Sequence, residues 1–293
     1  MKKKFENLQT FNHEEIRNMY IQEFFNLYMS NFESEGIGYQ ERNYILRKFW
    51  RNGVVAQSRA VGYNEIPIFT TFASSAEFNL YDFPTAVYLI NVRNSPLVSN
   101  KLLYVDSDVI LIYAMRNHMP IAYFIEQKVE KIVACESLIW QNQNALKMPF
   151  FVVSSAESKE SLANTLRKIL AGEPAVFGGL EVADAIRVLQ TNAPYLIDKL
   201  QIYREQLINE VLTFLGIDNN GAMQKKERSI IDEINSNNEN INVHGDCLID
   251  EMQEGFDRAN ALFGTNIHFK IKEPKVNSLH EEVSEDESEG DEE

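Results

Sequence analysis

The stretch NAPYLIDKLQIYREQLINEVLTFLG, residues Asn192–Gly216, determines the fold that the rest of the chain is expected to adopt. Its apolar side chains recur every three or four residues, which is typical of one face of an α-helix; they are Leu196, Leu200, Tyr203, Leu207, Val211 and Phe214. Asn192 can cap the start, Pro194 suits the first turn and Gly216 lies just past the end. The pattern predicts a helix of about 22 residues, which would be about 33 Å long.

A second long helix is predicted at Ile121–Lys147. Its apolar side chains have the same helical spacing; they are Ile125, Val129, Ile132, Val133, Ile139 and Leu146. Met148–Pro149 ends this helix, because the residue before a proline is disfavoured in helical backbone. About 27 residues would give a helix of about 40 Å. The two helices are expected to form an antiparallel hairpin, with residues 148–191 at its tip.

The residues at this tip change pattern three times within a short length of chain. Phe150–Val153 is a short apolar run that predicts a strand, Ser158–Leu170 is expected to be a helix, and Pro174–Phe177 is expected to be another strand before a pair of glycines. Together they predict a compact αβ piece between the two long helices.

The N-terminal part is predicted to combine helices with a β-rich module. Asn12 can cap a helix with acidic residues in its first turn, and helical spacing continues to Glu35. Tyr39–Trp50 is expected to form a second, shorter helix. From Gly53 to Met115 the pattern changes to short apolar or alternating runs separated by turn residues, which predicts strands; the runs are 54–56, 66–69, 86–90, 102–105 and 109–113.

The chain after the second long helix begins with polar sequence. Residues 217–245 are therefore expected to be a loop region, followed by a helix at Asp246–Phe263 and a strand at Asn266–Ile271. Beyond Pro274 the composition is that of an acidic, disordered tail. The predicted fold class is mainly α, with a small inserted β-rich module.

The net charge of the 293 residues is −15, but it is unevenly distributed. Residues 281–293 hold nine acidic residues and no basic one, so residues 1–280 carry a net charge of only −6. Nucleic-acid binding usually depends on a basic patch. Charge alone therefore predicts no nucleic-acid binding.

Cysteine content and hydropathy exclude two further classes. With only two cysteines, Cys135 and Cys247, the chain has no disulfide scaffold, and a reducing compartment fits. No run of about 18 uncharged apolar residues is present, so no membrane-spanning helix is expected. The start has three lysines but no apolar stretch behind them, unlike a secretory signal.

The motifs of catalysis and metal binding are absent or incomplete. There is no glycine-rich phosphate loop, and Gly36-Ile37-Gly38 lacks the third glycine of a dinucleotide site. His244-Gly245-Asp246-Cys247 offers two metal ligands without a matching second pair, and Asp106-Ser107-Asp108 is typical of a turn. We therefore expect no catalytic residues, no metal and no cofactor.

Several motifs, taken in order, resemble one protein family. They are 141–145 (QNQNA), 192–200 (NAPYLIDKL), 212–217 (LTFLGI), 225–228 (KKER) and 232–237 (DEINSN). They closely resemble the portal, or upper-collar connector, of small short-tailed phages with protein-primed genomes. The similarity is strongest from about Gln141 to Lys270, and is weaker but collinear through the N-terminal part.

The resemblance implies a role for each part of the chain. The long helices 121–147 and 192–216 would form the stem around a channel, and the αβ piece 148–191 the clip. Residues 1–120 would form an outer wing, 217–245 the channel loops and 246–273 a further wing or crown element, leaving 274–293 as the acidic tail. These are the ranges into which the chain is expected to divide.

The resemblance also implies which residues contact DNA and the packaging motor. Lys225 and Lys226 match a lysine pair of the channel loop, with Arg228 beside them, and Lys199 matches a channel-lining lysine. Arg204 lies near a second basic position of the channel. The basic N-terminus, linked in the family to motor attachment, would correspond to Lys2, Lys3 and Lys4.

The implied function is a ring of twelve subunits at one capsid vertex, through which double-stranded DNA is packaged and later ejected. The implied partners are further copies of the chain, the major capsid protein, a scaffolding protein, a lower-collar or tail protein and, transiently, a packaging ATPase. The sequence leaves open whether an RNA mediates motor attachment. The ring would assemble in the host cytoplasm and remain in the virion, with no membrane partner. The alternative is a lower-collar or tail ring component, but the order helix, αβ piece, helix favours the portal.

Overall fold

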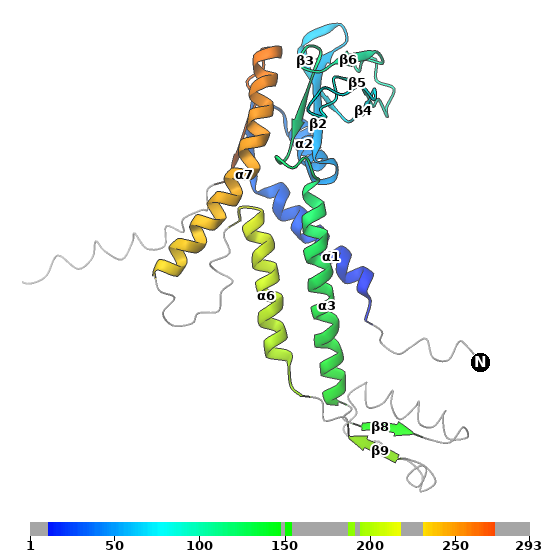
Figure 1. Cartoon of the computed structure of the whole chain (residues 1–293), viewed down its shortest axis with the longest axis vertical. Helices are drawn as coiled ribbons and strands as arrows, with labels where there is room; N and C mark the ends of the chain where they lie inside the picture. The colour runs from blue at the N-terminus through cyan, green and yellow to red at the C-terminus, as the bar shows by residue number, and fades with distance from the viewer. Residues whose placement is uncertain (1–10, 148–149, 154–186, 191–193, 218–230, 273–293) are drawn as a thin grey trace, which may run out of the picture.

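Two long helices that lie side by side connect the upper and lower parts of the molecule (Figure 1). The computed structural model describes residues 11–147, 150–153, 187–190, 194–217 and 231–272. The long helices are α3 (Ile121–Lys147) and α6 (Ile197–Phe214). At their lower end, β8 (Phe150–Val153) pairs antiparallel with β9 (Arg187–Gln190). The predicted hairpin with strand structure at its tip is thus observed, although β9 itself was not predicted.

The two helices pair through the apolar faces that their spacing predicted. Ile125, Val129 and Ile132 of α3 and Val211 of α6 are fully buried. Near the upper end, the rings of Phe124 and Phe214 stack with their centroids 4.0 Å apart. The faces are complementary because residues three and four apart lie on one side of a helix.

The start of α6 differs from the prediction that Asn192 caps it. Helical geometry begins at Ile197, and Asn192 lies outside the described residues. The backbone N–H of Leu196 donates instead to the side-chain oxygen of Asn142 on α3 (3.2 Å), while the Asn142 amide donates to the carbonyl of Pro194 (2.9 Å). A side chain of the neighbouring helix therefore satisfies backbone groups at the start of α6.

Helix α1 (His13–Ser30) is shorter than predicted. The predicted cap is confirmed, because the side chain of Asn12 accepts the N–H of Glu15 at 3.2 Å. The prediction that the helix continues to Glu35 was wrong, since β1 (Phe32–Glu35) pairs antiparallel with β10 (His268–Ile271). Burial of Phe32 and pairing with a strand from the far end of the sequence stabilise this segment more than one further helical turn would.

Helix α2 (Tyr39–Asn52) leads into the β-rich module. One sheet has the order β3-β2-β7 and the other β4-β5-β6, with all named pairs antiparallel. The strands are β2 (Val54–Ala60), β3 (Tyr63–Thr70), β4 (Phe72–Ser74), β5 (Ala86–Leu89), β6 (Leu102–Tyr104) and β7 (Val109–Tyr113). All five predicted strand runs are confirmed, and only the short β4 was missed.

Strand β7 explains why this part of the sequence is apolar without a clear alternation. Ile110 and Ile112 face the main core with the helices, whereas Val109 and Leu111 face a second core with Val87 and Leu89 of the other sheet. A strand buried on both faces has a continuous apolar sequence. The β3-β2-β7 sheet is therefore the middle layer of the upper part.

Helix α7 (Ile231–Phe263) is much longer than predicted. The predicted start at Asp246 was wrong, and only residues 218–230 of the predicted loop region 217–245 lie outside the described residues. Buried Ile241, Leu248 and Met252 continue one apolar face through the polar sequence. Gly245 also lies close to Gly216, where an added Cβ on Gly216 would be 2.8 Å from the Gly245 Cα, so the helix passes the end of α6 closely.

The described residues form a mixed fold of helix and sheet. The predicted helix Ser158–Leu170, the strand Pro174–Phe177 and the tail 274–293 lie outside the described residues. The division of the chain into wing, stem, clip and loops stays a prediction.

We expect Gly53→Ala to destabilise the fold more than Gly62→Ala. Both glycines have a positive φ, +73° and +82°, so both substitutions incur backbone strain of about 1 kcal/mol. Only at Gly53 would the new Cβ also lie 2.7 Å from the carbonyl carbon of Met119, whereas Gly62 has nothing within 4 Å. Overpacking adds about 1–3 kcal/mol. Urea denaturation followed by circular dichroism measures the difference; equal losses would contradict the close contact at Gly53.

Candidate functional site

The paired helices α3 and α6 carry the two predicted DNA-contact residues that the structure describes. Lys199 is exposed on the lower half of α6, whereas Arg204 is half-buried near its middle. Lys225, Lys226 and Arg228, and the predicted motor-attachment residues Lys2, Lys3 and Lys4, lie outside the described residues. The structure therefore shows the surroundings of Lys199 and Arg204 only.

Arg204 is part of a polar junction of three helices. Its Nη1 donates to Oε1 of Glu136 on α3 at 2.8 Å, and the Tyr20 hydroxyl of α1 donates to the same oxygen at 2.9 Å. The side chains of Arg204 and Glu136 are only 27% and 22% exposed. The carboxylate of Glu136 thus connects α1, α3 and α6 at one point.

The pKa shifts at this junction have clear physical causes. Burial raises the pKa of Tyr20, and the hydrogen bond to Glu136 and its charge raise it further. Burial lowers the pKa of Arg204, but the hydrogen bond and charge of Glu136 outweigh that effect, and the net pKa is raised. Both shifts favour a neutral Tyr20 phenol and a charged Arg204 guanidinium at this junction.

The partners of Arg204 could not be found from the sequence. Tyr20 and Glu136 lie on separate helices, and neither has a local pattern that distinguishes it from other residues of an amphipathic helix. The structure places the Arg204 guanidinium against Glu136, and contact with DNA at this position stays a prediction. Lys199 has no such partner among the described residues.

Further ion pairs join the same three helices. Arg17 of α1 lies 2.6 Å from Glu130 and 3.5 Å from Glu126, both on α3. Lys128 of α3 pairs with Glu210 of α6. Exposed pairs of this kind contribute about 0–1 kcal/mol each, so they fix the relative position of the helices more than they stabilise them.

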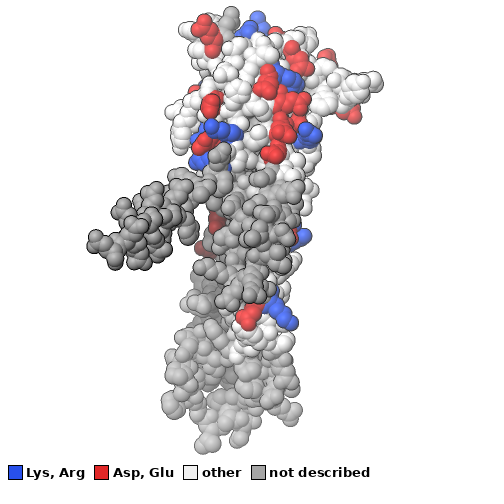
Figure 2. All heavy atoms as spheres, turned by 90° about the vertical axis from the view of Figure 1, so that its left-hand side faces the viewer, with Lys and Arg blue, Asp and Glu red and all other residues white. Residues whose placement is uncertain are grey.

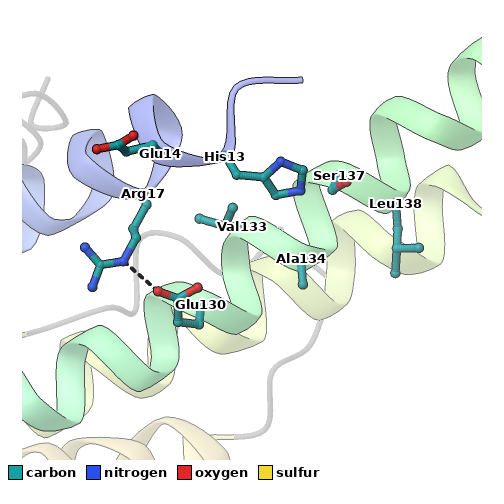
Figure 3. Close-up of a pocket in the computed structure, with 8 residues that line it drawn as sticks. All are labelled: His13, Glu14, Arg17, Glu130, Val133, Ala134, Ser137 and Leu138. Carbon is teal, nitrogen blue, oxygen red and sulfur yellow. Dashed lines mark hydrogen bonds and ion pairs between the residues drawn. The ribbon is translucent and has the colours of Figure 1, made fainter. Parts of the chain in front are cut away.

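A groove of about 560 Å³ lies between the start of α1 and the outer side of α3 (Figure 3). His13, Glu14 and Arg17 line its α1 side, and the ion pair of Arg17 with Glu130 closes one end. Val133, Ala134, Ser137 and Leu138 line its α3 side. Most of the surface exposed in the groove is apolar, and the groove is open to solvent. It therefore suits contact with another surface better than a chemical reaction.

The paired helices leave several large apolar side chains exposed. They are Tyr123, Leu138 and Leu146 on α3, Tyr195 and Leu196 just before α6, and Ile202 and Tyr203 on α6. Leu138 and Ile202 are each 51% exposed. Exposed apolar side chains of this size along a slender pair of helices are a candidate surface for contact with another protein.

The charges on the face seen in Figure 2 are of both signs. Lys and Arg are interspersed with Asp and Glu over the upper half, and no continuous basic surface is seen there. Within the described ranges, no group of three or more His, Cys, Asp or Glu could hold a metal ion. None of the described helices is long and apolar enough to cross a membrane.

This architecture, a layered β-rich upper part above two long paired helices with strands at their tip, resembles that of phage portal proteins. It is similar to an HK97-family phage portal protein from Corynebacterium diphtheriae, with a TM-score of 0.50 at 9% identity, over 89% of this chain and 95% of that one. A chain in the portal and tail of native bacteriophage P68 is also similar, at 14% identity and a TM-score of 0.47, over 90% of each chain. A third similar chain is from the virion of the native gene transfer agent particle, at 9% identity and a TM-score of 0.41, over 91% of this chain and 82% of that one.

The sequence itself places the chain more specifically. The sequence model of the Phage Connector (GP10) family matches residues 2–276, so the protein belongs to this family. The family consists of structural rather than enzymatic proteins. The resemblance to a phage connector, drawn from the sequence motifs, is thereby confirmed, and the kind of phage stays a prediction.

We expect Glu136→Gln to cost about 1–3 kcal/mol of stability, because it leaves the half-buried Arg204 charge without its anion. Glu126→Gln is the matched control: its side chain is 48% exposed, and Arg17 keeps its pair with Glu130, so the cost should stay below about 0.5 kcal/mol. Chemical denaturation of both variants measures the difference. A loss of stability with Glu126→Gln as large as that with Glu136→Gln would show that the junction contributes no more than an exposed ion pair.

Proposed function

We propose that this protein is the portal of a small short-tailed phage with a protein-primed genome. Twelve copies would form a ring at one capsid vertex, through which double-stranded DNA enters during packaging and leaves during ejection. Family membership and the portal-like fold support this proposal. The observation that carries it is the row of exposed apolar side chains on α3 and α6.

The proposal of a ring is supported by the helix surfaces that a single subunit leaves exposed. Each helix in a pair covers one side of the other, and α1 and the groove beside it cover only part of the remaining surface of α3. The sides that carry Leu138 and Ile202 have no covering element among the described residues. Neighbouring copies set side by side would bury these faces without any change of fold, as expected for a closed cyclic assembly.

The dimensions of the helices fit a channel for a duplex. Twelve helices of about 10 Å diameter placed side by side need a circumference of about 120 Å, which gives a centre line about 38 Å across and an opening of somewhat under 30 Å. A B-form duplex fits through this opening with a narrow layer of water, whereas fewer than about ten helices would block it. The argument concerns geometry alone and supports a ring of about this size.

The acidic charge of the chain also fits a conduit. Each phosphate that a protein neutralises strengthens DNA binding, so a strongly basic channel wall would hold the DNA rather than let it pass. Residues 1–280 carry a net charge of −6 and would weakly repel DNA along most of a channel. A single exposed lysine such as Lys199 becomes twelve charges in a ring, which would contact the duplex at one level only.

The remaining parts of the chain suggest where partners bind. The lower tip with β8 and β9 would face the packaging ATPase during assembly and a lower-collar or tail protein afterwards. The β-rich upper part would face the major capsid protein and, before maturation, the scaffolding protein. Lys2, Lys3 and Lys4 would contribute to motor attachment. The ring would assemble in the host cytoplasm and stay in the virion.

We expect Ile202→Asp to prevent ring formation, because a charge would replace an apolar side chain in the proposed contact between copies. Gln201→Asp introduces the same charge at the adjacent exposed position and should leave rings intact if the contact is made by the apolar side chains. Negative-stain microscopy and sedimentation velocity measure the assembly. Intact rings with Ile202→Asp would remove this face from the proposed interface.

We expect Lys225→Ala with Lys226→Ala to leave the ring intact but to impair retention of packaged DNA, because two rings of positive charge are lost from the proposed channel. Lys101→Ala is a control that removes a charge from an exposed position of the β-rich module. Packaging followed by nuclease protection measures retention. Unchanged packaging and retention in the double variant would remove the role assigned to these lysines.

A further inference from the structure

The second half of α2 carries a cluster of three positive charges, which we call the α2 basic cluster: Arg47, Lys48 and Arg51. Arg47 and Arg51 are exposed and lie one helical turn apart, and Lys48 lies beside both. The cluster is on α2, in the upper part of the molecule (Figure 1), whereas the proposed channel is assigned to α3 and α6. It is therefore a surface that the proposed function does not use.

The three charges are held close together. The ammonium of Lys48 lies over the ring of Tyr44, 5.2 Å from its centre, and Nε of Arg47 donates to the carbonyl of Asn43 at 3.0 Å. Burial lowers the pKa of Lys48, and the charges of Arg51 and Arg47 lower it further. The mutual repulsion thus acts on a side chain that is partly removed from water.

No carboxylate among the described residues forms an ion pair with this cluster. The described ion pairs use other cations: Arg17, Lys128, Arg204, Arg258, Lys270 and Arg116. Cations near the C-terminal end of a helix gain about 0.3–1 kcal/mol from the helix dipole. This gain offsets part of the repulsion among the three cations but does not neutralise their charge. A group of adjacent unneutralised cations is a binding surface for an anionic group.

The chain contains a segment of complementary charge, residues 281–293, with nine acidic residues and no basic one. The last described residue before it, Lys272, lies beside the end of α1, because its N–H donates to the carbonyl of Asn31 at 2.9 Å. Arg42 of α2 in turn donates to the carbonyl of Phe32, the neighbour of Asn31. The path towards the acidic segment therefore starts beside the helix that carries the cluster.

The distance is within reach of the chain. From Arg42 to Arg51 the helix rises about 14 Å at about 1.5 Å per residue. From Lys272 to Glu281 the chain can span about 30 Å at about 3.3 Å per residue. The first acidic residues can therefore reach the cluster of their own subunit, and those that follow can lie along it.

We propose that the acidic segment 281–293 binds to the α2 basic cluster of the same chain. The segment neutralises Arg47, Lys48 and Arg51 and keeps nucleic-acid phosphates away from them. It explains why an acidic protein carries an unpaired basic patch and why the acids are concentrated at one end of the sequence. This inference does not depend on the proposed channel function.

Carbodiimide cross-linking of the full chain tests the proposal, because this reagent joins a lysine amine only to a carboxylate in direct contact. We expect peptide mass spectrometry to find Lys48 linked to a glutamate or aspartate within 281–293. The linked chain should migrate as a single subunit on a denaturing gel. The yield should fall about tenfold or more in about 0.5 M NaCl, because salt screens the attraction.

Two paired variants complete the experiment. Arg47→Gln with Arg51→Gln retains Lys48 and should lower its cross-linking about tenfold, whereas Arg93→Gln with Lys101→Gln removes the same charge from exposed positions of the β-rich module and should not. Circular dichroism confirms folding, and the salt dependence of the unmodified chain provides a readout without mutation. Equal linkage to Lys101 or Lys199, linkage between copies, or binding of a short DNA duplex to the cluster of the full chain would each overturn the proposal.

Discussion

The pairing of α3 with α6 through complementary apolar faces is the constraint on which the rest of this structure depends. Ile125, Val129 and Val211 are fully buried in the main core, where α1 and α7 also pack against the pair. The upper β-rich part and the lower strand pair are attached to opposite ends of this pair (Figure 1). Any change in its register would therefore shift both ends relative to each other.

The polar junction of Tyr20, Glu136 and Arg204 adds a directional constraint to the apolar contact. Apolar faces can slide past one another with little change in buried area, whereas a shared carboxylate oxygen accepts hydrogen bonds in one arrangement only. Half-buried charge pairs contribute little net stability but are costly to break. The junction thus specifies how α1, α3 and α6 fit together, which is what a subunit needs if identical copies are to form a regular assembly.

The exposed surface of the paired helices is also the basis of the proposed function. A chain that extends a slender pair of helices into solvent leaves apolar side chains such as Ile202 exposed, and further copies are the simplest surface to cover them. Membership of the Phage Connector (GP10) family agrees with this proposal. Under the proposed function, the mildly acidic net charge and the isolated basic positions are what a DNA conduit would need, because such a wall would not hold the duplex tightly.

The sequence by itself determined the elements whose residues carry their own periodic pattern: α3 with its bounds, α2, the strands of the β-rich module and the family. It could not determine the end of α1, because the pairing of Phe32 with Ile271 joins residues at opposite ends of the chain. It missed the first half of α7, a polar stretch in which Ile241 is buried and Gly245 lies close to Gly216. It also assigned Arg204 by position in a motif, whereas the partner of that guanidinium is set by the packing of three helices. The periodicity of a helix or strand can be read from neighbouring residues. Contacts between residues far apart in the sequence are set only when the tertiary structure brings them together.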